Sequence, residues 1–349
     1  MTQRKLYLQP DGLSLEQQSE SPLLAGGPYS FSHCIRATRE DNGSLRRDRV
    51  AAKALGPEDQ ARLEALVKPR ATFAGIDMTR PSVMGVVNVT PDSFSDGGQR
   101  FDADKAIEDG LAMWKAGAAI VDVGGESTRP GAEPVPDEEE KRRVLPVVRE
   151  LSAQGVRVSI DSYHASVLEA AVEAGAVAIN DITALCGDPR SLEVVAASGV
   201  PVILMHMQGR PQTMQKSPSY DDVALDVFDF LEERIHRCLE AGIARERIAV
   251  DPGVGFGKTL QHNLELLNRL ALFHGLGCPI LLGISRKSFI SHLCGKLEPK
   301  ERGPGTLAAT LAGWARGVQM HRVHDVDEAL QALQVWTAID ACAQQDAVD

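Results

Sequence analysis

The chain has 349 residues, of which 43% are hydrophobic, so it can bury a large core and needs only one main domain. Its formal net charge of -11 argues against non-specific binding to nucleic acid, because neutralising phosphates requires a basic face. The six cysteines include no CxxC pair, which predicts neither a disulfide framework nor a zinc site. The sequence shows no secretion signal and no apolar run of ~18 residues, which predicts a cytoplasmic protein without a membrane span.

Residues 1–80 differ in composition from the rest and are predicted to form an N-terminal extension. Residues 19–28 are rich in Ser, Gly and Pro, and residues 40–44 form a polar turn, so only short ordered pieces are expected. Residues 57–67 begin with an acidic turn and continue with apolar residues at helical spacing, which favours one helix. No chemistry is assigned to this part of the chain.

Eight short apolar runs follow, and polar residues able to do chemistry stand at nearly every exit. The runs are residues 83–89, 119–123, 156–160, 177–179, 201–205, 248–250, 279–284 and 318–320. Between consecutive runs lies room for one helix, and helical patterns are clear at residues 137–152, 220–241 and 325–342. The repeat predicts an α/β fold, a (β/α)8 TIM barrel over residues 81–349, with its reactive mouth at the carboxyl ends of the strands.

Two loops at the predicted mouth have an unusual composition. The loop of residues 88–98 is longer than the ~2 to 6 residues usual between a strand and a helix, so it is either a turn-rich surface loop or a lid. Residues 124–132 contain two glycines, which let backbone approach a ligand closely. Arg129 in this loop either binds an oxyanion through its planar guanidinium or pairs with a nearby acid.

Carboxylates and an amide stand at several strand ends, namely at Asp161, Asn180, Asp181 and Asp251. In a closed barrel these side chains are expected to share one floor. They suit either a metal with hard oxygen ligands or a ligand rich in N–H donors, and spacing leaves both open. Residues 251–259 end as a phosphate-binding loop does, but Pro252 stands where that motif requires its first glycine. The segment is therefore predicted to form a glycine-rich wall with few side chains, among them Phe256.

Basic residues follow the seventh and eighth runs, at residues 285–288 and at Arg322 and His324. This is where the barrel fold usually binds anions, and a helix N-terminus is expected nearby at Gly303. A solvated basic patch is the alternative. His206 and His262 show no such grouping and are predicted to be packed or solvated.

Seven motifs, in order, closely resemble the dihydropteroate synthase family. They are NVTPDSFSDGG at 88–98, GGESTRPGA at 124–132, INDI at 179–182, MHMQG at 205–209, DPGVGFGK at 251–258, SRK at 285–287 and RVHDV at 322–326. The resemblance spans about residues 81–340. It implies a homodimeric enzyme that joins 6-hydroxymethyl-7,8-dihydropterin diphosphate to 4-aminobenzoate, releasing pyrophosphate in a Mg²⁺-dependent step of folate synthesis.

The resemblance also implies roles for individual residues. Those implied to bind the pterin are Asp161, Asn180, Met205, Asp251, Lys287 and Arg322. Those implied to bind the diphosphate are Asn88, Arg129, Arg322 and His324, with Asn88 also the Mg²⁺ ligand. Those implied to line the aminobenzoate pocket are Thr128, Pro130, Phe256, Lys287 and Ser288.

The expected chemistry needs no protein nucleophile. Pyrophosphate leaves a methylene on an electron-rich ring, so a ring-stabilised cation can form before the neutral amine attacks. Catalysis is therefore predicted to lie in charge stabilisation by Lys287, Arg322 and Mg²⁺, with Asp92 or Asp161 offsetting the positive charge of the pterin.

The chain departs from the family pattern after Asp161, where Ser162, Tyr163 and His164 replace the usual Thr and a basic residue. The extension also has no counterpart in the minimal enzyme. Two rival functions remain: a pterin-dependent methyltransferase barrel, which should not need the loops of residues 90–94 and 127–130, and a non-catalytic pterin-binding protein, which should have lost the diphosphate residues.

Overall fold

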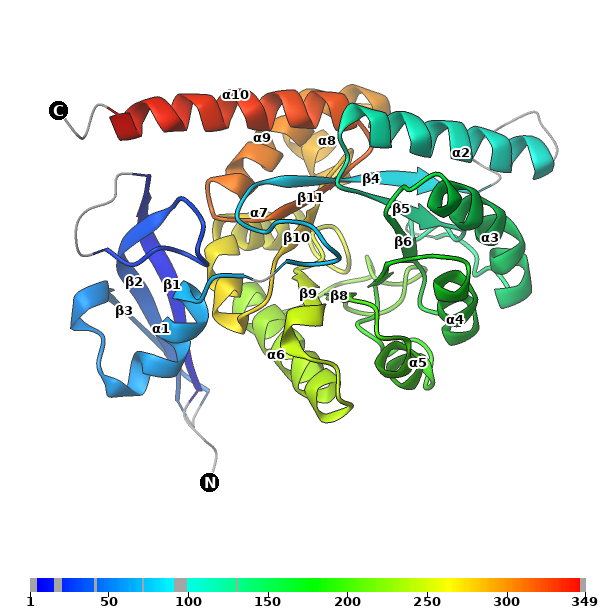
Figure 1. The fold of residues 1–349 in the computed structure, drawn as a ribbon. Helices are drawn as coiled ribbons and strands as arrows, with labels where there is room; N and C mark the ends of the chain where they lie inside the picture. The colour runs from blue at the N-terminus through cyan, green and yellow to red at the C-terminus, as the bar shows by residue number, and fades with distance from the viewer. Residues whose placement is uncertain are drawn as a thin grey trace.

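The computed structural model describes residues 5–15, 21–40, 43–70, 72–90, 99–129 and 131–345. A small antiparallel sheet near the N-terminus lies beside a larger barrel (Figure 1). The loop of residues 91–98, interpreted above as a lid or a surface loop, lies outside the described residues.

Within the described residues, eight parallel strands form the barrel, in the order β10-β11-β4-β5-β6-β7-β8-β9. They are β4 (Ser82–Asn88), β5 (Ile120–Gly124), β6 (Val158–Asp161), β7 (Ala178–Asp181), β8 (Val202–Met205), β9 (Ile248–Asp251), β10 (Leu281–Gly283) and β11 (Met320–Val323). A parallel bridge between Val250 and Ile280 joins the two ends of the sheet. The predicted TIM barrel is thereby confirmed, with each predicted run overlapping one strand.

Helices cover the outside of the barrel (Figure 1). They are α2 (Gln99–Ala116), α3 (Asp137–Ala153), α4 (Ala165–Glu173), α5 (Ser191–Ser198), α6 (Val223–Glu240), α7 (Leu260–Asn268), α8 (Ser288–Cys294), α9 (Gly303–Trp314) and α10 (Val326–Gln345). In α6 the Asp222 side chain caps the first turn by accepting a hydrogen bond from the backbone N–H of Leu225. Within the described ranges, no helix has the length and apolar character needed to cross a membrane.

A short segment before the first barrel strand closes the base of the barrel. Phe73 and Ile76 form a bridge with each other, and both are buried, as is Met78. Their side chains share a core with residues at or beside the starts of the barrel strands, such as Met84 and Ile120. The predicted boundary at residue 80 therefore comes too late, because the segment of residues 73–78 is packed as part of the barrel.

The extension is more regular than the sequence predicted. Its elements are β1 (Lys5–Ser14), β2 (Ser30–Arg39), β3 (Leu45–Ala51), two short 3-10 turns at Ala52–Ala54 and Pro57–Asp59, and α1 (Gln60–Val67). The strands pair antiparallel in the order β1-β2-β3. A small core including Leu8, Phe31, Cys34 and Leu66 lies between the sheet and α1.

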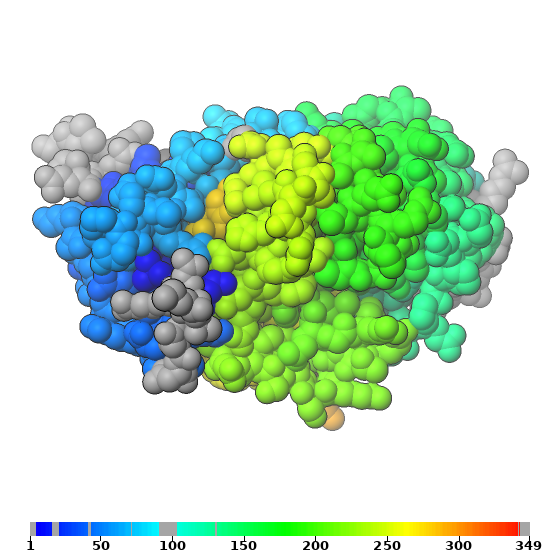
Figure 2. All heavy atoms as spheres, turned by 90° about the horizontal axis from the view of Figure 1, so that it is seen from below, coloured from blue at the N-terminus to red at the C-terminus, as the bar shows by residue number. Residues whose placement is uncertain are grey.

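One helix of the barrel, α6, carries the charged partners of the extension, while the 3-10 segment Leu270–Leu276 packs most extensively against β1 and α1. Tyr7 of β1 is fully buried, its ring meets Phe228 edge-on at 5.6 Å, and its hydroxyl donates to Asp229 at 2.9 Å. Lys5 also pairs with Asp229 at 2.8 Å, and Arg39 pairs with Asp226 at 2.7 Å. In Figure 2 the blue surface of the extension adjoins the yellow-green surface of the barrel.

Candidate active site

Four charged or polar side chains form a hydrogen-bonded floor inside the carboxyl end of the barrel. Arg322 of β11 donates from Nε to Asp122 at 2.7 Å and from Nη2 to Asp161 at 2.6 Å. Asn180 of β7 donates from its amide to the same Asp122 oxygen at 2.9 Å. Three of the predicted pterin-binding residues, on strands far apart in sequence, therefore meet at one buried network.

The strand register explains why the side chains converge. Gly124, Asp161 and Asn180 occupy matched positions on the neighbouring strands β5, β6 and β7. A Cβ on Gly124 would lie 3.4 Å from the Cβ of Asp161, which is an ordinary contact distance. Gly124 therefore lies directly beside the carboxylate at the centre of the barrel.

Asp251 and Lys287 extend this floor from the other side of the barrel. A Cβ on Gly283 would lie 3.5 Å from Oδ2 of Asp251 and 4.0 Å from both Nζ of Lys287 and Cβ of Arg322. The backbone N–H of Gly253 donates to the other Asp251 oxygen at 2.7 Å. One carboxylate, one ammonium and one guanidinium thus surround the same small volume, and the guanidinium joins it to the rest of the floor.

Burial shifts the pKa values of the titratable floor residues toward pH 7. Desolvation raises the pKa of Asp161 to about 7, against the opposing charge of Arg322. Desolvation also lowers the pKa of Lys287 to about 8, against the opposing charge of Asp251. The pKa of Asp251 is raised as well, again chiefly by burial. Small changes in the site can therefore change its protonation near pH 7.

Lys287 is held by the wall that follows β9. Its ammonium lies 4.5 Å from the centre of the Phe256 ring and donates to the backbone oxygen of Val254. Phe256 is half-buried. The predicted aminobenzoate wall and the pterin floor therefore share Lys287 as a common boundary.

A second lysine, Lys258, fixes the shape of that wall. Its buried ammonium donates to the backbone oxygens of Gly253 and Phe256 at 2.9 and 3.0 Å, and contacts Nδ1 of His206 at 2.9 Å. Gly253 has φ +70, and a Cβ there would lie 1.8 Å from the backbone oxygen of His206, so only glycine fits. His206 is packed, as predicted, and desolvation followed by the nearby Lys258 lowers its pKa to about 2.

The rim after β11 is less cationic than the sequence predicted. Desolvation, reinforced by Arg322 and Arg286, lowers the pKa of His324 to about 4, so the imidazole is neutral near pH 7. Its Nδ1 contacts Ser285 Oγ at 2.9 Å. Arg286 is paired with Asp325 through a two-point contact, so its charge is already balanced. The N-terminal turn of α9 does lie beside the β10 exit, because Thr306 accepts from the backbone N–H of Arg286.

The remaining predicted residues that the structure describes lie around the same mouth. Asn88 ends β4 in register with Gly124 and is half-buried, whereas Met205 ends β8 in register with Asp251 and is buried. Thr128 is half-buried and Arg129 exposed on the loop after β5, and Ser288 is exposed at the start of α8. Asp92 and Pro130 lie outside the described residues.

Sequence and structure differ for two aspartates, Asp181 and Asp122. Asp181 was expected in the floor, but it accepts from the backbone N–H groups of Thr183 and Leu185, because it points to the opposite face of β7 from Asn180. Asp122 was not assigned a role, yet it joins Arg322 to Asn180. A carboxylate inside an apolar run was the available signal, since fully buried aspartates are rare unless paired.

The closed barrel and its buried, acceptor-rich floor define a TIM-barrel enzyme with a small-molecule site at the strand carboxyl ends. The family described as pterin binding enzyme matches residues 84–324. That span contains every strand of the barrel except the first two residues of β4, and every residue of the floor.

Similar proteins agree with this match. The chain is 48% identical over 266 residues to dihydropteroate synthase of Escherichia coli, covering 76% of this chain and 94% of that protein. It is similar to the Xanthomonas albilineans dihydropteroate synthase structure with 4-aminobenzoic acid, at 48% identity and TM-score 0.73, covering 77% of this chain and 97% of the other. The structure of that enzyme with 7,8-dihydropteroate matches at 45% identity and TM-score 0.70, covering 76% and 96%. The chain belongs to the pterin binding enzyme family and, within it, to the dihydropteroate synthases, which confirms the resemblance.

Proposed function

We propose that the chain catalyses the dihydropteroate synthase reaction, with the floor binding the pterin and the rim binding the diphosphate. This reaction condenses 6-hydroxymethyl-7,8-dihydropterin diphosphate with 4-aminobenzoate to give 7,8-dihydropteroate and pyrophosphate in folate synthesis. The observation that carries the assignment is the network of Asp122, Asp161, Asn180 and Arg322 inside the barrel mouth. A buried set of acceptors suits a pterin ring, whose amino and N–H groups are donors.

The floor would bind the pterin through Asp161, Asn180 and Asp251. Each is largely buried, and a ring that failed to pair with one of them would leave a desolvated polar group, at a cost of ~1 to 3 kcal/mol. Lys287 and Arg322 supply donors on the carbonyl side, and Met205 supplies an apolar surface. A heterocycle without matching donors should therefore be rejected strongly.

The diphosphate would lie above this floor, toward Asn88, Arg129 and His324. Asn88 offers an amide oxygen at the mouth, a hard ligand of the kind Mg²⁺ accepts beside water and phosphate oxygens. When bound, Mg²⁺ would supply charge neutralisation for the departing pyrophosphate. His324 would act there as a neutral hydrogen-bond donor, with Arg129 and Arg322 as the cations.

The aminobenzoate would enter beside Lys287, between the loop after β5 and the wall after β9. Phe256 offers an aromatic face, while Thr128, Pro130 and Ser288 complete the pocket that family resemblance implies. Lys287 would then contact both substrates, which places its ammonium near the bond that forms.

The chemistry needs positioning and charge rather than a covalent enzyme intermediate. Loss of pyrophosphate would leave positive charge on the pterin methylene, and Asp161 or Asp92 would offset it. The neutral amine would then attack. Positional isotope exchange in the pterin diphosphate without 4-aminobenzoate would support this order, whereas exchange that requires the amine would contradict it.

One assay tests the function and the assignment together. The purified chain is mixed with the pterin diphosphate, 4-aminobenzoate and Mg²⁺, and pyrophosphate and dihydropteroate are measured. Product is expected from the wild type, and Lys287→Ala and Asp161→Ala are expected to abolish most of it. Undiminished turnover in both variants would remove the site assignment but not the function.

Two further expectations accompany this proposal, a homodimer and a cytoplasmic location. The outer face of α10 exposes Val335 by 55% and Ile339 by 64%, next to Leu307 and Leu311 of α9. An apolar face of this kind suits a second copy of the chain. Light scattering should give a dimer mass that Ile339→Asp lowers to a monomer, and cell fractionation tests the location.

A further inference from the structure

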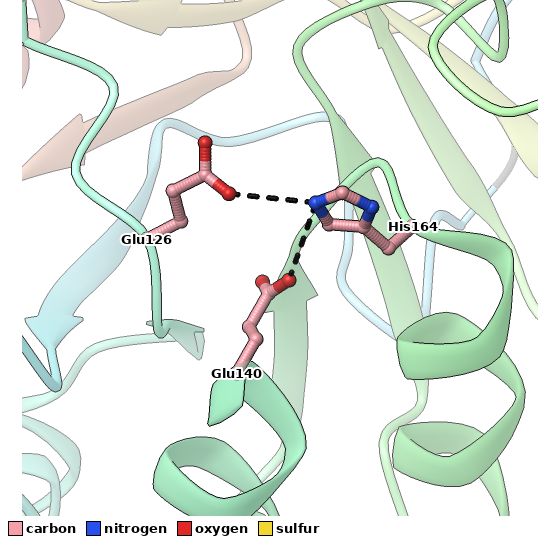
Figure 3. Close-up of side chains that lie close together, drawn as sticks. All are labelled: Glu126, Glu140 and His164. Atoms are coloured by element: carbon pink, nitrogen blue, oxygen red, sulfur yellow. Dashed lines mark hydrogen bonds and ion pairs between the residues drawn. The ribbon is translucent and has the colours of Figure 1, made fainter. Parts of the chain in front are cut away.

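Three side chains beside the floor, but outside it, point toward one another (Figure 3). Glu126 follows β5, Glu140 lies in the first turn of α3, and His164 precedes α4. One ligand atom from each lies within 4.8 Å of the other two. Nε2 of His164 lies 3.4 Å from Oε2 of Glu126 and 3.9 Å from Oε2 of Glu140.

Glu140 lacks the hydrogen-bond partners that a buried carboxylate needs. The residue has 0% exposure, and within the described part of the chain neither of its carboxyl oxygens has a hydrogen-bond partner. Its carboxyl group points toward His164 and Glu126 in Figure 3. A buried charge is normally paired, hydrogen-bonded or bound to a metal, because desolvating it alone is costly. This oxygen pair therefore requires a cation or a proton to balance its charge.

Neighbouring side chains are arranged to orient the other two groups. The Tyr163 hydroxyl donates to Oε1 of Glu126 at 2.8 Å, and Oε2 accepts from the backbone N–H of Val135 at 3.3 Å while it also faces His164. Nδ1 of His164 lies 3.1 Å from Oδ1 of Asp137, whose other oxygen accepts from Ser166 at 2.6 Å. A carboxylate beside one imidazole nitrogen favours a proton there and a lone pair on the other nitrogen, as in many metal sites.

We propose that Glu126, Glu140 and Nε2 of His164 bind one divalent transition-metal ion. Ligands ~2.0 to 2.2 Å from a zinc ion lie roughly 3 to 4 Å from one another, so the observed 3.4 and 3.9 Å need little rearrangement. One imidazole and two carboxylates favour Zn²⁺, Co²⁺ or Mn²⁺, whereas Mg²⁺ prefers oxygen ligands alone. The site is thus distinct from the Mg²⁺ position at Asn88.

The metal would tie together three segments around the floor. Glu126 belongs to the loop that carries Thr128 and Arg129, and His164 lies three residues after Asp161. The ion would join these segments to α3 through Glu140. Its role would be to position Asp161 and the loop after β5, and it takes no part in the reaction itself.

A charged imidazole between acids is the competing explanation. Burial raises the pKa of Glu140 to about 8, against the charge of His164 and the nearby Ser162 hydroxyl, so a proton can occupy this carboxyl group when no metal does. A lysine at residue 164 would serve such an ion-pair network equally well, but its ammonium cannot bind a metal. The variant His164→Lys therefore separates the two explanations while keeping a cation in place.

Metal binding to the full-length chain tests the proposal without substrates. After treatment with a chelator, the protein is titrated with Zn²⁺ alone or Co²⁺ alone in buffer containing excess Mg²⁺, and bound metal is measured by equilibrium dialysis and mass spectrometry. We expect one tightly bound ion per chain, a higher Tm, and a Co²⁺ absorption spectrum free of thiolate bands. Asp137→Asn should weaken binding about 10- to 100-fold.

Matched variants decide the outcome. His164→Lys and Glu140→Gln should lose the tight site while circular dichroism shows an unchanged fold, and the exposed His236→Ala should keep it. The exposed cysteines are the same in all these proteins, so thiol binding cancels in the comparison. Equal metal content and affinity in wild type and His164→Lys would overturn the proposal. Because no turnover is measured, this result stands apart from any failure of the synthase assay.

Discussion

The barrel mouth and the junction between the extension and α6 both bring opposite charges together, but in different surroundings. In the mouth Asp122 has 0% side-chain exposure and its partner Arg322 21%. At the junction Lys5 is 33% exposed and Asp229 24%. The mouth pairs charges where water is largely excluded, and the junction pairs them where water still screens them.

The difference indicates what each set of charges does. Desolvated pairs contribute little net stability, because burying the ions offsets much of their attraction. Their value in the mouth is a rigid set of donors and acceptors that is already dehydrated before the substrate arrives. The exposed pairs at the junction, each worth ~0 to 1 kcal/mol, give the extension a preferred orientation on α6.

Removing one floor charge should have the largest effect. Asp161→Asn keeps the shape but removes a charged partner of Arg322, and breaking a buried pair costs ~3 to 5 kcal/mol. The value of kcat/KM for the pterin diphosphate should fall roughly 10²- to 10³-fold. Asp229→Asn at the junction is the matched control and should change kcat/KM less than about twofold. A comparable fall of kcat/KM in both variants would contradict the proposed difference between the mouth and the junction.

The pH dependence of turnover comes next. Asp161, with its pKa raised to about 7, loses its acceptor charge below that pH, and Lys287, with its pKa lowered to about 8, loses its positive charge above it. Outside this window kcat/KM should fall about tenfold per pH unit. Lys287→Arg should remove the alkaline limb, since arginine stays charged. An alkaline limb that persists in this variant would assign it to another group.

The same pKa shifts destabilise the substrate-free protein near neutral pH. The folded-state pKa of Asp161 is raised, so its favourable contribution is present below about pH 4 and is lost as pH rises through about 7. The folded-state pKa of Lys287 is lowered, so its unfavourable contribution is relieved as pH rises from about 8 toward 10.5.

Deleting residues 1–56 should affect stability more than catalysis. The truncation removes β1 to β3 and uncovers the apolar face of α6 around Phe228, so Tm should fall. The floor and its hydrogen bonds remain, so turnover should stay measurable. A folded truncated protein without any turnover would show that the extension contributes to the site.

The smallest effect is expected for Tyr7→Phe. It removes one hydrogen bond to the charged Asp229 and keeps the ring packing, so the free energy of unfolding should fall by ~1.5 kcal/mol. Urea unfolding measures this change, and turnover should be unaffected. A drop in kcat/KM would indicate that α6 transmits the state of the junction to the mouth.

The eight strands could be predicted from the sequence because each is a local apolar run. Most floor residues could be predicted too, because they directly follow these runs. The last strand was placed at residues 318–320, whereas β11 is Met320–Val323, because His321 interrupts the apolar pattern although it is fully buried. The sheet of the extension was harder to predict, because antiparallel pairing joins residues far apart in the sequence, such as Leu6 and Thr38. The cluster of Glu126, Glu140 and His164 was missed because no spacing in one element signals it.

The segment of residues 73–78, which closes the base of the barrel, has a consequence for how the chain assembles. Phe73 and Met78 leave the ribosome before every strand they pack against, and β11 is the last of these to appear. Their apolar side chains must therefore stay exposed, or be shielded by other contacts, until nearly the whole chain has been synthesised. A shortened gene that begins after Met78 would yield a barrel open to water from beneath, so a minimal enzyme has to start before Phe73.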